Sequence, residues 1–159
     1  MNHYHFIGWK YDIINNTESF STVEKGHVYF VATPIGNVKD ITLRALEILR
    51  NVDYVCAEDT RHTINLFRHI SIPHKQMISH HEHNLDTSIP RIIALAQNGS
   101  SIAVVSDAGT PGISDPGTQL AYALAQANVP LHPIPGASAV VTALSISGFP
   151  ATPFTFVGI

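Results

Sequence analysis

Short apolar runs alternate with segments of helical period five times between residues 28 and 148, and this alternation constrains the fold more than any other feature. The runs are rich in β-branched and aromatic residues, which favours strands buried on both faces. Such alternation is typical of parallel strands joined by right-handed helical crossovers. The sequence therefore predicts an α/β fold with an open, doubly wound, mainly parallel five-stranded sheet and helices on both faces. The strands are expected at residues 28–33, 54–57, 76–79, 102–105 and 131–134.

Capping residues mark the expected helix starts. Asp40 is interpreted as the N-cap of a helix through about residue 51, and Leu43 is expected in its inner apolar stripe. Asp115 followed by Pro116 suits the start of a fourth helix, and Ser138 is expected to cap a fifth. Further helices are expected from residue 60 and over residues 87–98, and a sixth strand over residues 154–157.

Composition limits the class of protein. With 45% hydrophobic and 13% charged residues, the 159-residue chain can bury enough apolar surface to offset its ordering entropy, which argues against disorder. Cys56 is the single cysteine, so an intramolecular disulfide framework is excluded and a reducing, cytoplasmic compartment is expected. No run approaches the roughly 20 apolar residues that span a bilayer, so no membrane association is expected.

The chain divides into three expected parts. Residues 1–25 show no sustained period and are interpreted as a flexible N-terminal arm, residues 26–150 as one ligand-binding α/β domain, and residues 151–159 as the start of a linker or strand. Residues 26–91 contain seven basic, seven acidic and seven His residues, whereas residues 92–159 contain no Lys or Arg. A net charge of −3 gives no overall basic surface for a phosphate backbone. Any contact with nucleic acid is therefore expected from the first two-thirds of the chain.

The connection SDAGTPGISDPG at residues 106–117 is the most informative one. In open α/β sheets ligands bind outside the carboxyl ends of the strands, and this connection follows the fourth strand. Asp107 is placed to accept hydrogen bonds from an ammonium group or from ribose hydroxyls, whereas Asp115 is explained by helix capping. Gly109 permits close backbone contact with a ligand. A long connector without a ligand is the alternative.

Two further connections, at residues 32–42 and 133–139, are also rich in Gly and Pro. Pro34 stiffens the exit from the first strand, and Gly36 permits close approach of a ligand to the backbone. Neither connection contains a phosphate-binding motif, and each alone is explained as a simple turn. The three alternate connections together favour one shared ligand site.

The connection AEDTRHT at residues 57–63 concentrates charged side chains in one turn. Arg61 is a candidate for binding a phosphate or carboxylate, and His62 for assisting proton removal. A solvated charged turn is the alternative.

The stretch HHEHN at residues 80–84 places His81 and His83 on one face if the preceding strand continues, which invites a metal-site hypothesis. No regular zinc motif is completed, so no metal is expected, and hydrogen-bonding groups that face a substrate are the favoured interpretation.

Five stretches form a recognisable pattern: ATPIGNVKDIT, AEDTRHT, HEHN, VVSDAGTPGISDPG and PIPGASAVVTALSISGFP. Together they resemble the tetrapyrrole methylase superfamily, and specifically its RsmI-type branch of small-subunit ribosomal RNA 2′-O-ribose cytidine methyltransferases. The resemblance covers residues 26–159 and implies the N-terminal domain of that fold. It also implies an S-adenosylmethionine-dependent enzyme that methylates a ribose 2′-hydroxyl of a cytidine in small-subunit ribosomal RNA.

The resemblance also implies site residues. For catalysis, loop placement makes Arg61 and His62, positioned by Asp59, the hypothesis. Contact with RNA is assigned to three residues of the histidine-rich stretch, His81, His83 and Asn84. The residues that would line the cofactor are Pro34, Gly36, Asp107, Gly109, Ile113, Ser114 and Ala137.

The resemblance further implies a second α/β domain beginning soon after FPATPFTFVG, whereas this sequence ends at Ile159. The remaining half of the cofactor pocket is then expected from that missing C-terminal domain or from a partner in a homodimer. Two alternatives stay open: the same chemistry on a tetrapyrrole or a protein side chain, and a non-catalytic, truncated fragment.

Overall fold

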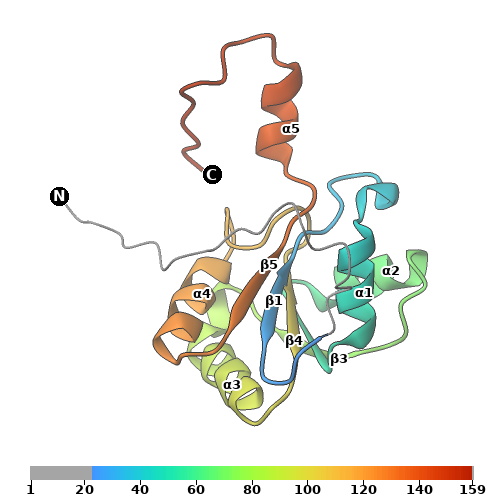
Figure 1. The fold of residues 1–159 in the computed structure, drawn as a ribbon, viewed down its shortest axis with the longest axis vertical. Helices are drawn as coiled ribbons and strands as arrows, with labels where there is room; N and C mark the ends of the chain where they lie inside the picture. Colours follow the sequence, from blue (N-terminus) through green and yellow to red (C-terminus); the bar gives the residue numbers. More distant parts are fainter. Residues whose placement is uncertain (1–22, 159) are drawn as a thin grey trace, which may run out of the picture.

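The computed structural model describes residues 23–158 and contains one sheet of five parallel strands in the order β3-β2-β4-β1-β5 (Figure 1). Four strands have the predicted bounds. The first ends at Val31 rather than at residue 33, because Thr33 leaves the ladder and pairs with Gly109. The predicted parallel α/β sheet is thus confirmed. The strands are β1 (Val28–Val31), β2 (Tyr54–Ala57), β3 (Gln76–Ser79), β4 (Ile102–Val105) and β5 (Leu131–Ile134).

Helices occupy the connections between the strands, and one follows β5. Two short 3-10 helices, η1 (Val38–Asp40) and η2 (Glu82–Asn84), precede α1 and α3. The α-helices are α1 (Leu43–Asn51), α2 (Thr60–His69), α3 (Leu85–Gln97), α4 (Gly117–Gln126) and α5 (Ala139–Ile146).

Both faces of the sheet are buried. Successive residues of a strand point to opposite faces, so a strand covered on both sides needs apolar residues throughout. All four residues of β4 are buried, as this rule requires. One face packs against α1 and α2 and the other against α3 and α4, which confirms the predicted helices on both faces (Figure 1). The helix residues at the centres of these two layers are Ile48, Leu49 and Phe67 on one face, and Ile92, Leu120 and Leu124 on the other.

The predicted start of α1 is wrong. Thr42 is the N-cap, and its side chain accepts a hydrogen bond from the backbone N–H of Ala45 at 3.0 Å. Asp40 is instead the last residue of η1. Asn37 is the N-cap of this turn, and its side chain accepts a hydrogen bond from the backbone N–H of Lys39. Leu43 therefore lies in the first turn, where it is 85% exposed rather than part of the inner stripe.

The later boundaries also differ from prediction. Helix α4 begins at Gly117 with Pro116 in the N-cap position, and the Asp115 carboxylate accepts from the N–H groups of Gly112 and Gly117. Ser138 occupies the N-cap of α5, but its side chain makes no capping hydrogen bond. The predicted strand at 154–157 is absent, because this segment turns back beside α5 and does not reach an edge of the sheet (Figure 1).

Residues 1–22 of the predicted N-terminal arm lie outside the described residues, whereas Val23 packs against the layer of α1 and α2. Within residues 23–158, no helix is both long and apolar enough to cross a membrane.

Candidate functional site

A cavity of ≈ 460 Å³ lies beyond the carboxyl ends of β2 and β4, where ligands bind in open α/β sheets. Most of its lining comes from the connection between β4 and α4, including Asp107, Gly109 and Ile113. Other elements complete it from the side: Ile35 follows β1 and Glu58 follows β2. Ser138, the N-cap of α5, contributes together with Ala139 and Val140 of the helix and Phe156 of the segment after it.

The connections after β1 and β4 form one wall of this cavity. Thr33 and Gly109 exchange two backbone hydrogen bonds, of 2.9 Å and 3.0 Å, and the Thr33 hydroxyl donates to the Ser106 carbonyl at 3.3 Å. Gly109 has a φ of 81°, a conformation that favours glycine. A side chain at this position would meet Ile35 at 3.5 Å. At Gly109 itself, no side chain separates a ligand from the backbone of the wall.

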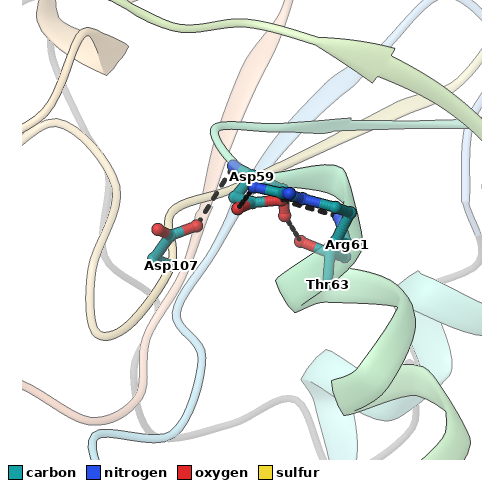
Figure 2. Close-up of polar contacts among 4 residues, drawn as sticks. All are labelled: Asp59, Arg61, Thr63 and Asp107. Atoms are coloured by element: carbon teal, nitrogen blue, oxygen red, sulfur yellow. Dashed lines mark hydrogen bonds and ion pairs between the residues drawn. The ribbon is translucent and has the colours of Figure 1, made fainter.

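Asp107 is oriented by the turn after β2. Its Oδ1 accepts a hydrogen bond from the backbone N–H of Asp59 at 3.1 Å, as Figure 2 shows. This bond joins the carboxyl ends of two neighbouring strands, β2 and β4. Asp107 therefore presents a carboxylate of defined orientation to the cavity.

Asp59 and Arg61 form a bidentate pair at the start of α2 (Figure 2). Arg61 donates from its Nε to Asp59 Oδ1 at 3.2 Å and from its terminal nitrogen to Oδ2 at 2.9 Å. These hydrogen bonds, together with that from the Arg61 backbone N–H, lower the pKa of Asp59 to about 2. The Arg61 side chain is 88% exposed, so a charged donor lies at the surface next to the Asp107 turn.

None of the three predicted catalytic residues lines the cavity. Asp59 caps α2, Arg61 is held on Asp59, and His62 is exposed in the first turn of the helix. Glu58 lines the cavity instead. Burial raises the pKa of the Glu58 carboxyl, the charges of Asp107 and Asp115 raise it further, and His81 opposes them.

Glu58 is a residue that the sequence interpretation missed, although a signal was present. It directly follows the buried strand β2 and so lies at a strand end, as Asp107 does two residues after β4. Ser138 and Phe156 were missed as well. Phe156 had been assigned to a strand, which would have placed it at the sheet.

The predicted cofactor residues separate into two groups. Asp107, Gly109, Ile113 and Ser114 line the cavity together. Pro34, Gly36 and Ala137 do not line it, although their neighbours Ile35 and Ser138 do. The Ala137 carbonyl accepts a hydrogen bond from the Thr110 hydroxyl at 3.2 Å and so links the connection after β5 to the connection after β4.

The residues predicted to contact RNA are engaged in local structure around η2. His81 is its N-cap and accepts from the His83 N–H at 3.3 Å, and the Asn84 side chain accepts from the His81 N–H at 2.9 Å. The His83 side chain is exposed beside the His81 ring.

Across residues 23–158, no three His, Cys, Asp or Glu side chains are arranged to hold a metal ion. Burial raises the pKa of the Cys56 thiol to about 12.

The chain is similar to known methyltransferases. Residues 27–157 match the family model of tetrapyrrole (corrin/porphyrin) methylases. The "Ribosomal RNA small subunit methyltransferase I" of Synechocystis sp. is 51% identical over 133 residues, which are 84% of this chain and 47% of that protein. A relative of the same name from Micromonospora olivasterospora is 46% identical over 144 residues, 91% of this chain and 46% of the relative.

Solved structures show the same likeness. The uroporphyrin-III-C-methyltransferase of Thermus thermophilus has a TM-score of 0.60 and 28% identity, and the match covers 79% of this chain and 53% of that one. A cobalt precorrin-4 methyltransferase has a TM-score of 0.60 at 18% identity over 76% of this chain and 49% of its own, a likeness of fold alone. The chain spans about half the length of the curated relatives it matches.

Proposed function

The chain belongs to the tetrapyrrole (corrin/porphyrin) methylase family, and on this basis we propose that it methylates a ribose 2′-hydroxyl of a cytidine in small-subunit ribosomal RNA, with S-adenosylmethionine as the methyl donor. The two relatives named for ribosomal RNA are 46% and 51% identical to this chain, whereas the solved uroporphyrin-III-C-methyltransferase is 28% identical. These identities favour RNA over a tetrapyrrole as the substrate. The observation that carries the proposal is the cavity at the strand ends, with the oriented Asp107 in its lining.

The chemistry of the cavity fits this donor. The donor carries a positive charge on sulfur, an ammonium group and ribose hydroxyls, but no phosphate. Among residues 23–158, no Lys or Arg lines the cavity, and Asp107 supplies a carboxylate that can accept from an ammonium or hydroxyl. Gly109 leaves the backbone accessible, and Ile113 adds apolar surface. When bound, S-adenosylmethionine supplies an electrophilic methyl group.

The residues of the chain then contribute by holding the reactants in place and by binding charged groups of the substrate. A fixed cavity wall holds the reactants close together, which supplies much of the rate in a direct displacement. Arg61 is exposed and paired with Asp59, the residue that hydrogen-bonds Asp107, and it is suited to bind a phosphate of the RNA because a guanidinium matches phosphate geometry. The roles of His81, His83 and Asn84 in RNA contact, and of His62 in proton removal, remain proposals based on their positions.

The C-terminal segment supports a site completed from outside the described chain. Ile146, the last residue of α5, and Phe149, just after the helix, are 84% and 79% exposed. We therefore propose that a second domain, or a second copy in a homodimer, covers this surface and supplies the rest of the pocket. A ribosomal RNA substrate would place the protein in the cytoplasm.

Calorimetry tests the cofactor site. The 159-residue chain is expected to bind S-adenosylmethionine, and Asp107→Asn is expected to weaken binding at least roughly tenfold, the effect of losing a charge-assisted hydrogen bond. Glu47→Gln on α1, remote from the cavity, is the matched control. Equal affinity for wild type and Asp107→Asn would contradict the assigned site, and no binding by wild type would favour the truncated-fragment alternative.

A methyl-transfer assay tests the substrate. Small-subunit ribosomal RNA, a uroporphyrinogen and a total protein fraction are each supplied with labelled donor, and the RNA is digested to nucleosides for mass spectrometry. We expect 2′-O-methylcytidine from the RNA alone. Transfer only to the tetrapyrrole or to protein would replace the proposed substrate. Wild-type activity in both Arg61→Ala and His62→Ala would remove these two residues from the mechanism.

A further inference from the structure

His80 is a buried side chain, and one nitrogen of its ring makes no hydrogen bond. It is 3% exposed, and its Nδ1 lies 2.8 Å from the hydroxyl of Ser88 on α3. Its Nε2 has no hydrogen-bond partner anywhere in residues 23–158. Buried polar atoms are nearly always paired with protein or with an ordered water. A bound water would satisfy this nitrogen beside the Pro116 backbone, whose interaction with the ring raises the pKa of His80.

A small cavity of ≈ 10 Å³ adjoins His80, and its polar lining includes Glu58, Ser106 and Asp115. This volume is close to the lower limit of roughly 10–15 Å³ for one water molecule, which also needs two to four polar partners. Glu58 lines the large cavity as well, so it stands between His80 and the site of the proposed reaction. Asp115 also lines both cavities, but its carboxylate already accepts hydrogen bonds from the N–H groups of Gly112 and Gly117, so Glu58 is the shared carboxylate that remains available.

We propose that Glu58 takes the proton from the hydroxyl that is methylated, and that His80 positions the Glu58 carboxylate through one water bound in the small cavity. The inference rests on the proposed function. As the substrate oxygen bonds to the methyl carbon, its O–H bond breaks and the proton passes to a Glu58 carboxylate oxygen. The donor sulfur keeps the electron pair of the bond it loses, so atoms and charges balance.

The charges around both residues suit these roles. Burial, Asp107 and Asp115 raise the pKa of Glu58, which brings it closer to the working range of a general base, while His81 acts in the opposite direction. Burial lowers the pKa of His80, and His81 adds to this effect, whereas the Pro116 backbone and Asp115 oppose it. A neutral His80 ring can hold a water without adding a charge. His62, by contrast, lines neither cavity.

The first experiment measures RNA methylation. Glu58→Gln is expected to lower the turnover number at least roughly 100-fold, the usual effect of losing a general base, and to change the Kd for the donor by a much smaller factor. Glu58→Asp should recover part of the rate, and the control Glu47→Gln should keep all of it. Wild-type turnover in Glu58→Gln would overturn this inference alone. A wild-type chain that methylates nothing would contradict the proposed function, and the assignment of Glu58 as proton acceptor with it.

The second experiment needs neither donor nor RNA. In the chain with ¹³C-labelled glutamate, NMR titration should place the Glu58 pKa above the ordinary glutamate value. His80→Leu should raise it further, because the water loses the donor that helps it stabilise the carboxylate. Ser88→Ala leaves Nε2 in place and should have the smaller effect. An unchanged Glu58 pKa in His80→Leu contradicts the positioning role.

A third measurement uses the wild-type chain and so does not depend on whether a His80 variant folds. A high-resolution crystal structure is expected to show one water within hydrogen-bonding distance of both His80 Nε2 and the Glu58 carboxylate. A cavity without that water would overturn the link between the two residues.

Discussion

The sheet with its four flanking helices and the segment after β5 are both apolar, yet they bury their side chains to opposite extents. Each of α1–α4 buries at least two residues, whereas α5 buries none. Ile48 on α1 is fully buried and Ile146 on α5 is 84% exposed. Apolar character alone therefore does not determine burial: a helix also needs a neighbouring apolar face, and α5 extends away from the sheet (Figure 1).

The large cavity lies where these two regions meet. Asp107 and Glu58 reach it from the ends of buried strands, and Ser138 and Phe156 from the C-terminal segment. One side of the site is thus built on the rigid sheet and the other on a segment with no core of its own. Substitutions on the two sides should therefore differ in their effects on stability.

The largest effect is expected from Ile48→Ala. Removing this fully buried side chain leaves a space between α1 and the sheet, and should lower the free energy of unfolding by about 3 kcal/mol. Urea denaturation followed by circular dichroism measures the change. A loss below about 1 kcal/mol would mean that the layer of α1 repacks easily, and the contrast with α5 would weaken.

A somewhat smaller loss is expected from Gly117→Ala, at the edge of the site on the sheet side. The new Cβ would lie 2.8 Å from Asp115 Oδ1 and 2.9 Å from the Gly112 nitrogen, two atoms already held together by hydrogen bonds. We expect a destabilisation of roughly 1–3 kcal/mol and weaker donor binding, because the connection must shift. Unchanged stability would show that this part of the wall is pliable.

Glu58→Gln should have a small effect of the opposite sign that depends on pH. The raised pKa of Glu58 means that its favourable contribution to stability is complete below its ordinary pKa of 4.5 and is lost as the pH rises through the value in the folded protein. The variant should therefore be more stable than wild type at pH 7, by less than about 1 kcal/mol because solvent screens a half-exposed group. The difference should disappear near pH 3.5, well below that ordinary value. Thermal denaturation at both pH values measures it, and a variant less stable than wild type at pH 7 would contradict it.

The smallest effect is expected from Ile146→Ala, the same chemical change as in α1 made on α5. Because the side chain is 84% exposed, the free energy of unfolding should change by less than about 0.5 kcal/mol. Urea denaturation of this variant beside Ile48→Ala provides the matched pair. A large loss would show that α5 is packed in solution, for example against a second copy of the chain.

The fold was predictable where the pattern was strong. The bounds of β2–β5 were predicted to the residue. The reason is clearest for β4, whose four buried residues form a continuous apolar run between polar turns, as expected of a parallel strand buried on both faces. Helix starts were less predictable, because several candidate caps competed. Asp40 and Thr42 are both good N-caps, and the preceding 3-10 turn, which the sequence pattern does not reveal, selects Thr42.

The location of the site could be predicted from the sequence better than the residues that form it. The rule that ligands bind at strand ends located Asp107 and the connection around it. It did not distinguish Glu58 from Asp59, two adjacent acids, because the direction of each side chain depends on where the turn ends and α2 begins. The capping of α2 turns Asp59 toward Arg61, and Glu58 is the acid that lines the cavity.

The hydrogen bond from the Asp59 amide to Asp107 gives the molecule a built-in reporter. Whatever draws charge from the Asp107 carboxylate weakens this bond, and the amide that feels the change belongs to the N-cap of the helix carrying Arg61 and His62. We therefore expect a ligand bound to Asp107 to change the hydrogen bonding of the α2 N-cap. A single backbone resonance, that of Asp59, becomes the signal by which a ligand in the cavity can be followed.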